Sequence, residues 1–267
     1  MELKGKEMKA FAKSLVGRLI FLARLQRLTL SNVAPVVAFH RISKEPPCDS
    51  LTCSLADFRA YCQFFLSHFN VVPLGRIVQM LGHHEPFTNE LAITFDDGYQ
   101  DNYGLAAPVL QDLGLPATFF VTTDFIDSDV VPWWDLKQGK VFPWMTWEQV
   151  RALSAMGFEI GSHTSTHADL GVIPVEEALI ELSKSRAELE QQLSRPISLF
   201  AYPYGRPSNM TEANRALVKD AGYASCCSCF GGMNKRGDDP YSLHRIPISS
   251  WFSSPYGLGF EVALHRV

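Results

Sequence analysis

The stretch that decides the fold is Leu91-Ala92-Ile93-Thr94-Phe95-Asp96-Asp97-Gly98-Tyr99. Leu91–Asp97 is an apolar, β-rich run, which is typical of a strand, and it ends in a polar turn with a glycine. Two adjacent carboxylates after a buried strand are costly unless a positive charge offsets them, and a divalent cation would supply that charge. The stretch therefore predicts a buried strand with a charged site at its carboxyl end.

Further runs of the same kind alternate with helical patterns along the chain. The other predicted strands are Val36–His40, Ala117–Thr122, Phe158–His163, Ile197–Tyr202 and Ile246–Ser249. The predicted helices are Ser54–His68, Gln100–Leu113, Thr146–Met156, Pro174–Leu193 and Thr211–Ala221. Strands that alternate with helices predict an α/β protein with a parallel sheet. In such folds the functional residues lie at the carboxyl ends of the strands.

Two other strand ends carry side chains suited to chemistry. His163 and His167 are four residues apart in Gly161–His167, so both can face one ion if the chain turns after the strand. Tyr202-Pro203-Tyr204-Gly205 is a rigid turn that can present backbone N–H groups. One aspartate and two neutral histidines leave open coordination positions, and such a site suits a zinc-activated water.

Taken in this order, the motifs resemble those of the polysaccharide deacetylase family, carbohydrate esterase family 4. The resemblance rests on Thr94–Tyr99, Ser162–His167 and Tyr202–Gly205, with Pro116–Val121 similar to the family's strand between the first two motifs. It covers residues 36–249 and implies a distorted (β/α) barrel with about seven parallel strands. We expect a catalytic domain over residues 33–267, preceded by an amphipathic segment over residues 1–32.

The resemblance also implies residue roles. Asp97, His163 and His167 would bind a divalent metal, with Zn²⁺ expected and Co²⁺, Ni²⁺ or Mn²⁺ as alternatives. Asp96 would be the general base that deprotonates water, and Tyr204 would offer its backbone N–H to an oxyanion. The expected reaction is hydrolysis of the N-acetyl group of an N-acetylhexosamine-containing glycan or glycan precursor.

Two positions depart from the family pattern. Ala201 stands where the family often has an arginine that braces the base, and Arg245 is a candidate to replace it from another strand. The general acid that protonates the leaving amine is also open, with His244 and His40 as equal candidates. His265 is a weaker candidate, because it lies two residues from the end of the sequence, where fraying is expected.

Aromatic residues near the motifs are candidates for sugar contacts. We expect Trp133 or Trp134 to line a cleft, since sugar rings stack on aromatic faces, although packing in the core or rim would also explain them. Tyr99, Tyr202 and Pro203 are further candidates for substrate binding because they belong to the motifs.

The amino-terminal segment is basic and amphipathic. Its apolar residues fall on one helical face: Met8, Phe11, Leu15, Leu19, Leu22 and Leu25. Two hypotheses follow: residues 1–30 lie on an anionic membrane surface, or the helix packs on the domain with a solvated basic face. Charges interrupt every window long enough to span a bilayer, and Arg18 and Arg24 break any signal-peptide core. We therefore expect a cytoplasmic protein or one peripheral to the inner membrane surface.

Charge and cysteine content narrow the partners. The 267 residues carry a net charge of −4, which divides into +5 over residues 1–30 and −9 over the remainder. This balance argues against nucleic-acid binding by phosphate neutralisation. Cys226-Cys227-Ser228-Cys229 is a weak metal-binding signal, because no second cysteine pair or histidine pair lies at zinc spacing. All six cysteines are expected to be reduced and mostly buried.

Three functions are compatible with these patterns. The leading hypothesis is the glycan deacetylase, acting on a polymer or a lipid-linked sugar; Phe39-His40-Arg41, the Tyr-Pro-Tyr-Gly turn and Arg245-Ile246 resemble the subgroup linked to exopolysaccharide and cell-envelope synthesis. The second is hydrolysis of a non-glycan amide or cyclic imide at the same site. The third is a carbohydrate-binding protein with a degenerate site.

Overall fold

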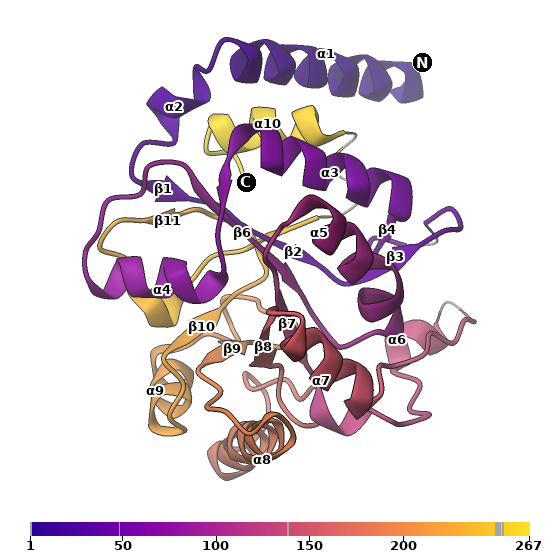
Figure 1. The fold of residues 1–267 in the computed structure, drawn as a ribbon, viewed down its shortest axis with the longest axis vertical. Coiled ribbons are helices and arrows are strands. Elements are labelled where there is room, and N and C mark those ends of the chain that lie inside the picture. The colour runs from indigo at the N-terminus through magenta and orange to yellow at the C-terminus, as the bar shows by residue number, and fades with distance from the viewer. Residues whose placement is uncertain (1, 48, 138, 249–251, 253) are drawn as a thin grey trace.

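A parallel sheet that curls into a half-barrel organises the molecule (Figure 1). The computed structural model describes residues 2–47, 49–137, 139–248, 252 and 254–267, without the side chains of residues 2–7. Seven strands follow the order β10-β9-β8-β7-β6-β2-β12, and all neighbours are parallel. Their bounds are β2 (Val36–Phe39), β6 (Glu90–Phe95), β7 (Thr118–Val121), β8 (Glu159–Ser162), β9 (Leu199–Ala201), β10 (Ser225–Cys227) and β12 (Ile246–Pro247). The predicted distorted barrel of about seven parallel strands is confirmed.

Short strands complete the β structure. β5 (Asn70–Val71) pairs in parallel with the start of β6. β1 (Val33–Ala34) pairs antiparallel with β11 (Asn234–Lys235), and β3 (Arg41–Ser43) pairs in parallel with β4 (Thr52–Ser54). The β3–β4 pair follows directly after β2 and therefore sits beside the carboxyl end of the main sheet.

Helices connect the strands and surround the sheet (Figure 1). Their bounds are α1 (Glu2–Leu22), α2 (Gln26–Thr29), α3 (Leu55–His68), α4 (Leu74–Gly82), α5 (Ala107–Leu113), α6 (Trp133–Leu136), α7 (Trp147–Ala155), α8 (Val175–Leu193), α9 (Glu212–Asp220) and α10 (Pro255–Ala263). Three shorter helical segments are the π-helix η1 (Asn102–Ala106) and the 3₁₀ segments η2 (Thr123–Phe125) and η3 (Pro240–Ser242). Over the described ranges, no helix has both the length and the apolarity needed to cross a bilayer.

Local signals in the sequence explain where several helices begin and end. The Ser54 side chain accepts a hydrogen bond from the Asp57 backbone N–H and starts α3. Thr146 and Gln149 form a reciprocal capping box at the start of α7. Gly114 ends α5 with a left-handed φ of 63°, which a residue without a Cβ adopts at little cost.

The two faces of the sheet bury different side chains, because successive residues of a strand alternate in direction. Val36, Ala92, Phe120 and Leu199 lie in one apolar cluster, against which α4 packs. The residues next to them in each strand belong to a larger cluster shared with α3, α5, α7 and α8. Side chains that continue the α4-facing series beyond the strand ends therefore meet at one end of the half-barrel.

The sequence did not predict every element. β10 coincides with the cysteine run that gave the weak metal signal, and Cys226 and Cys227 are buried in the sheet. The five cysteines that the structure describes are all free: Cys53, Cys62, Cys226, Cys227 and Cys229. Of the predicted strand Ile246–Ser249, β12 accounts for the first two residues, and Ser249 lies outside the described residues.

Candidate metal and catalytic site

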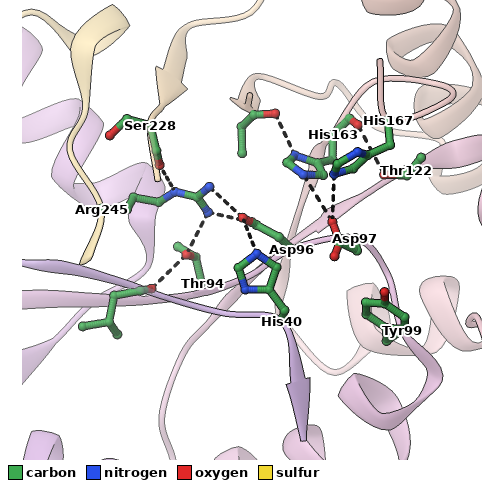
Figure 2. Close-up of polar contacts among 12 residues, drawn as sticks. His40, Thr94, Asp96, Asp97, Tyr99, Thr122, His163, His167, Ser228 and Arg245 are labelled. Atoms are coloured by element: carbon green, nitrogen blue, oxygen red, sulfur yellow. Dashed lines mark hydrogen bonds and ion pairs between the residues drawn. The ribbon is translucent and has the colours of Figure 1, made fainter. Parts of the chain in front are cut away.

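Nine of the thirteen predicted site residues line a cavity of about 540 Å³ at the carboxyl ends of the strands. His40, Asp96 and His163 continue the α4-facing alternation of β2, β6 and β8, which explains why three strands deliver them to one place. Figure 2 shows these side chains pointing toward one another. All three line the cavity, together with Asp97 and His167.

Asp97, His163 and His167 form a compact triangle. The Oδ1 atom of Asp97 lies 3.4 Å from His163 Nε2 and 3.3 Å from His167 Nε2 (Figure 2). Their three donor atoms lie within 4.8 Å of one another. Ligand atoms about 2.0–2.1 Å from a tetrahedral zinc ion are about 3.3–3.4 Å apart, so the observed spacing fits a metal of that size.

The hydrogen bonds around the triangle leave its donor atoms available. His163 Nδ1 faces the carbonyl oxygen of Ala201 at 2.8 Å, which favours a proton on Nδ1 and a lone pair on Nε2. Asp97 Oδ1 is buried and accepts no conventional hydrogen bond from the described residues. Burial lowers the pKa of His167 despite the neighbouring carboxylates, which favours the neutral, ligating form. The three residues therefore fit a divalent cation.

Asp96 is held by a buried arginine. Arg245 donates from Nη1 to Asp96 Oδ1 at 2.6 Å and from Nη2 to Oδ2 at 2.8 Å, and both side chains are almost fully buried (Figure 2). Burial by itself raises the pKa of Asp96, but the Arg245 guanidinium, together with His163 and His40, outweighs burial, and the net pKa lies below the ordinary value. Arg245 thus contacts Asp96 as the family's arginine would, although the position of that arginine is occupied by Ala201 in this chain.

Further bonds fix the guanidinium of Arg245. Its Nε donates to the Ser228 carbonyl oxygen at 2.6 Å, and Nη1 also donates to Thr94 Oγ1 at 3.1 Å. Thr94 in turn donates to the Val37 carbonyl oxygen at 2.8 Å. The arginine is therefore bonded to groups from β6 and from the segment after β10, and the orientation of Asp96 depends on three parts of the sheet.

His40 is the candidate acid that lies in the cavity. Its Nε2 atom is 3.9 Å from Asp96 Oδ2, and its side chain is partly exposed to the cavity (Figure 2). Donor atoms of His40, Asp96 and Cys229 lie within 4.8 Å of one another. Burial raises the pKa of the Cys229 thiol to about 12, so the protonated thiol is favoured at neutral pH.

The two other candidate acids lie elsewhere, which corrects the equal ranking of His244 with His40. The His244 ring faces the Gly231 carbonyl oxygen at 3.1 Å and packs edge-on against Phe230, outside the cavity. Arg245 reaches Asp96, and neighbouring side chains of an extended segment point to opposite sides, so His244 points away. His265 is exposed and hydrogen-bonds through Nε2 to the Thr29 carbonyl oxygen.

The turn after β9 brings a backbone N–H to the cavity. Tyr204 has a left-handed φ of 60°, its ring lies 5.0 Å from the ring of His167, and it lines the cavity. Among the described residues, none accepts a hydrogen bond from the Tyr204 backbone N–H. Tyr202 lines the cavity, whereas Pro203 is buried in the turn and accepts from Gly205 N–H. The predicted substrate contact of Pro203 is corrected to a role in shaping this turn.

Two tryptophans border the cavity and one tyrosine supports them. Trp133 is 60% exposed, and the Trp134 ring lies 4.7 Å from the ring of His167. Tyr99 is fully buried, and its hydroxyl accepts from Trp134 Nε1 at 2.9 Å and donates to Asp135 Oδ2 at 3.0 Å. The prediction that Tyr99 contacts substrate is therefore wrong, because the side chain lies behind the cavity wall.

Sequence reasoning missed the group that fixes this wall. Arg41 follows directly after His40, is buried, and forms ion pairs with Asp135 and with Asp49, a cavity-lining residue. Arg41 Nη1 also donates to Tyr99 Oη at 3.3 Å. A charged residue at the end of a buried strand was the available signal, since a buried arginine requires carboxylate partners.

Comparison with known proteins places the chain in a family. A profile described as polysaccharide deacetylase matches residues 84–226. The YxkH protein of Bacillus subtilis (strain 168), which is named for the same family, is 26% identical over 85% of this chain and 76% of its own length. Two solved structures share the fold: Streptococcus pyogenes deacetylase PplD in complex with acetate (TM-score 0.71, 22% identity, 85% of this chain and 96% of that chain) and IcaB from Ammonifex degensii (TM-score 0.71, 21% identity, 88% and 98%). Because the profile covers more than half of the residues, the chain belongs to the polysaccharide deacetylase family.

Proposed function

We propose that this deacetylase hydrolyses the N-acetyl group of N-acetylhexosamine residues in a glycan or a lipid-linked glycan precursor. The observation that carries the proposal is one cavity in which Asp97, His163 and His167 form a metal-sized triangle beside Asp96, an aspartate paired with Arg245. In the reaction, a water oxygen forms a bond to the acetyl carbon and the bond from that carbon to nitrogen breaks. The products are acetate and a free amino sugar.

Asp96 is the proposed general base. Its carboxylate takes the proton of the attacking water, and the Arg245 guanidinium holds it ionised and in a fixed orientation. A divalent cation bound by Asp97, His163 and His167, with zinc as the expected ion, supplies Lewis acidity that lowers the pKa of water and polarises a carbonyl group. These assignments place the base next in sequence to a metal ligand, and both side chains line the cavity.

His40 is the proposed general acid, because the leaving nitrogen must gain a proton before the carbon–nitrogen bond breaks. It is the candidate that lines the cavity, and it faces Asp96 at 3.9 Å. The backbone N–H of Tyr204 is the proposed oxyanion donor, since negative charge develops on the carbonyl oxygen during attack. The proposed base and acid are thus neighbours in the cavity.

Trp133 and Trp134 support a sugar as substrate. An exposed indole at the cavity mouth and a second indole beside His167 offer flat apolar faces on which a pyranose ring can stack. Cationic side chains of Lys137 and Arg206 also line the cavity and are exposed. They are compatible with a substrate that carries negative charge near the acetylated sugar.

The degenerate binding protein is disfavoured by two contacts. The sequence favoured a degenerate site because an arginine that braces the base was missing and the general acid was not identified. In the structure Arg245 contacts Asp96, and His40 lies 3.9 Å from the same carboxylate. The cyclic imide alternative shares the same site and makes a different prediction, namely ring opening without acetate release.

Acetate release from defined oligosaccharides tests the proposal. The metal-free protein is reconstituted with zinc and assayed on N-acetylglucosamine oligomers, with and without chelator. We expect zinc-dependent acetate release that Asp96→Asn lowers by about 10²-fold or more without loss of bound zinc. Asp129→Asn, on an exposed loop, is the matched control. Normal turnover by Asp96→Asn would exclude Asp96 as the base, and zinc-loaded protein that opens only cyclic imides would favour that alternative.

A further inference from the structure

Helix α1 packs on the rest of the protein through a face other than the apolar face that the sequence predicted. It packs along α10 (Figure 1). A Cβ on Gly17 would lie 2.0 Å from the Tyr256 carbonyl oxygen, so the helices approach closely there. Phe21 is buried against rings of α3, and Lys13 pairs with Glu261 at 2.5 Å. The helix therefore packs on the domain with exposed basic residues, as one hypothesis held, but the packed face is not the apolar face that the sequence indicated.

The large apolar residues of α1 point to solvent instead. The exposed side chains are Met8 (70%), Phe11 (71%), Leu15 (50%), Leu19 (59%) and Leu22 (63%) in α1, together with Leu25 (51%) just before α2 and Leu28 (78%) in α2. We call these seven residues the apolar stripe. Soluble proteins seldom leave a row of this length exposed without a partner, because burying each side chain is favourable.

From residue 8 onward, the charged side chains of α1 and α2 all have one sign. Residues 8–30 contain five basic residues and no acidic residue. Lys13 is neutralised by Glu261, whereas Lys9, Arg18, Arg24 and Arg27 are exposed. Arg18, Arg24 and Arg27 form no ion pair with any residue that the structure describes. The remaining chain carries −9, so this segment is a local cationic, apolar surface on an acidic protein.

We propose that α1 and α2 bind the surface of an anionic lipid bilayer through the apolar stripe. An amphipathic helix of this kind inserts its apolar face among the headgroups, while lysine and arginine at its borders contact lipid phosphates. A second copy of the chain fits less well, because a two-fold interface would bring the same cations together without a carboxylate from residues 8–30. In Figure 1, α1 lies at the outer edge beyond α10 and apart from α6.

Vesicle co-sedimentation with the full chain tests the proposal independently of catalysis. The probes are vesicles of phosphatidylcholine alone and of phosphatidylcholine mixed with phosphatidylglycerol. We expect binding to the mixed vesicles, which high salt weakens. Leu19→Glu should remove binding, and Arg24→Gln with Arg27→Gln should weaken it by about fivefold for each charge. Val172→Glu, at a 79% exposed position on another surface, is the matched control and should bind normally.

Each outcome decides the proposal. Because Leu19 is 59% exposed, Leu19→Glu should leave the fold intact, and an unchanged melting temperature would verify this. Equal binding of Leu19→Glu and the parent chain would overturn the proposal, as would no binding of the parent chain to anionic vesicles. A dimer in solution that Leu19→Glu dissociates, without vesicle binding, would assign the stripe to self-association instead. Retained acetate release by Leu19→Glu would separate the membrane contact from the proposed activity.

Discussion

The carboxylate of Asp96 and the guanidinium of Arg245 are both removed from water, which costs several kcal/mol for each ion. Two parallel hydrogen bonds between them, with two further acceptors for the arginine, offset that cost. Replacing one member leaves the other buried and unpaired, typically at a cost of about 3–5 kcal/mol. The pair thus couples the stability of the sheet to the ionisation of the proposed base.

Arg245→Gln should move the acid limb of the pH–rate profile to higher pH. Arg245 lowers the pKa of Asp96 against the effect of burial, so its removal raises that pKa and protonates the base over a wider pH range. The measurement is kcat/KM against pH. Arg245→Lys keeps the positive charge and should return the acid limb partway to its position in the parent protein. Arg59→Gln, on the surface, is the control. An acid limb that stays in place would mean that Arg245 does not set the ionisation of the base.

At the scale of single residues, the sequence predicted which side chains belong to the site better than it predicted the contacts between them. Asp96, Asp97, His163 and His167 follow predicted strands, and the structure brings all four into one cavity. Arg245 lies 149 residues from Asp96, a contact that local patterns cannot show. The acid stayed ambiguous for a related reason: the direction of a side chain at a strand end depends on register, and register depends on pairing between distant strands.

At the scale of elements, the wall formed by α6 depends on hydrogen bonds behind it. Trp134 donates to the Tyr99 hydroxyl, which donates to Asp135, and Arg41 pairs with that aspartate. Burial raises the pKa of Asp135. Arg41 and the Tyr99 hydroxyl oppose this effect, because they stabilise the ionised carboxylate. The direction of the partly buried Trp134 indole is thus determined by fully buried polar groups.

Tyr99→Phe should raise KM with a smaller effect on kcat. The variant removes the hydroxyl that holds Trp134, and a hydrogen bond of about 1 kcal/mol corresponds to about a fivefold change in KM. Steady-state kinetics on one oligosaccharide measures the two constants. Tyr223→Phe is the matched control, since it also removes a buried tyrosine hydroxyl hydrogen bond, but away from the cavity. A KM equal in both variants would show that Trp134 needs no such anchor.

Thr146→Ala should lower stability through the loss of the capping box of α7. The Thr146 side chain accepts from Gln149 N–H, and such caps contribute about 1 kcal/mol. For a protein of this size, the melting temperature should fall by about 2–4 °C. Thr146→Ser keeps the hydroxyl and should melt close to the parent. If both variants melt alike, the cap contributes nothing measurable.

Elements with clear start and stop signals were predicted well, and those without such signals were missed. α3 and α7 have side-chain caps, and α5 ends at a glycine with positive φ. β10 is three residues long and consists of serine and cysteine, so composition gave no strand signal. Its place at the sheet edge comes from pairing with β9, which is a tertiary effect. The division of the chain at residue 32 remains a prediction.

At the scale of the whole molecule, bound metal should stabilise the fold. A ligand that binds the native state alone contributes about 2.7 kcal/mol when its free concentration is about 100 times Kd, so zinc should raise the melting temperature by about 5–10 °C. Asp97→Asn should abolish this rise. Asparagine suits this test because Asp97 has a φ of 75°, a conformation that asparagine also tolerates. Calorimetry with and without chelator is the measurement, and an unchanged rise in Asp97→Asn would exclude the three-ligand site.

The pairing of β12 with β2 has a consequence for folding. β12 follows almost all of the barrel in sequence, yet the adjoining Arg245 is the partner of Asp96, which comes directly after β6 near the sheet centre. Contacts between such distant segments close long loops, and they slow folding relative to local contacts. A chain emerging from the ribosome therefore presents Asp96 long before its partner exists. During synthesis the pair of Asp96 and Arg245 can form only after Arg245 has been made, so we expect deacetylase activity to appear only once β12 is available.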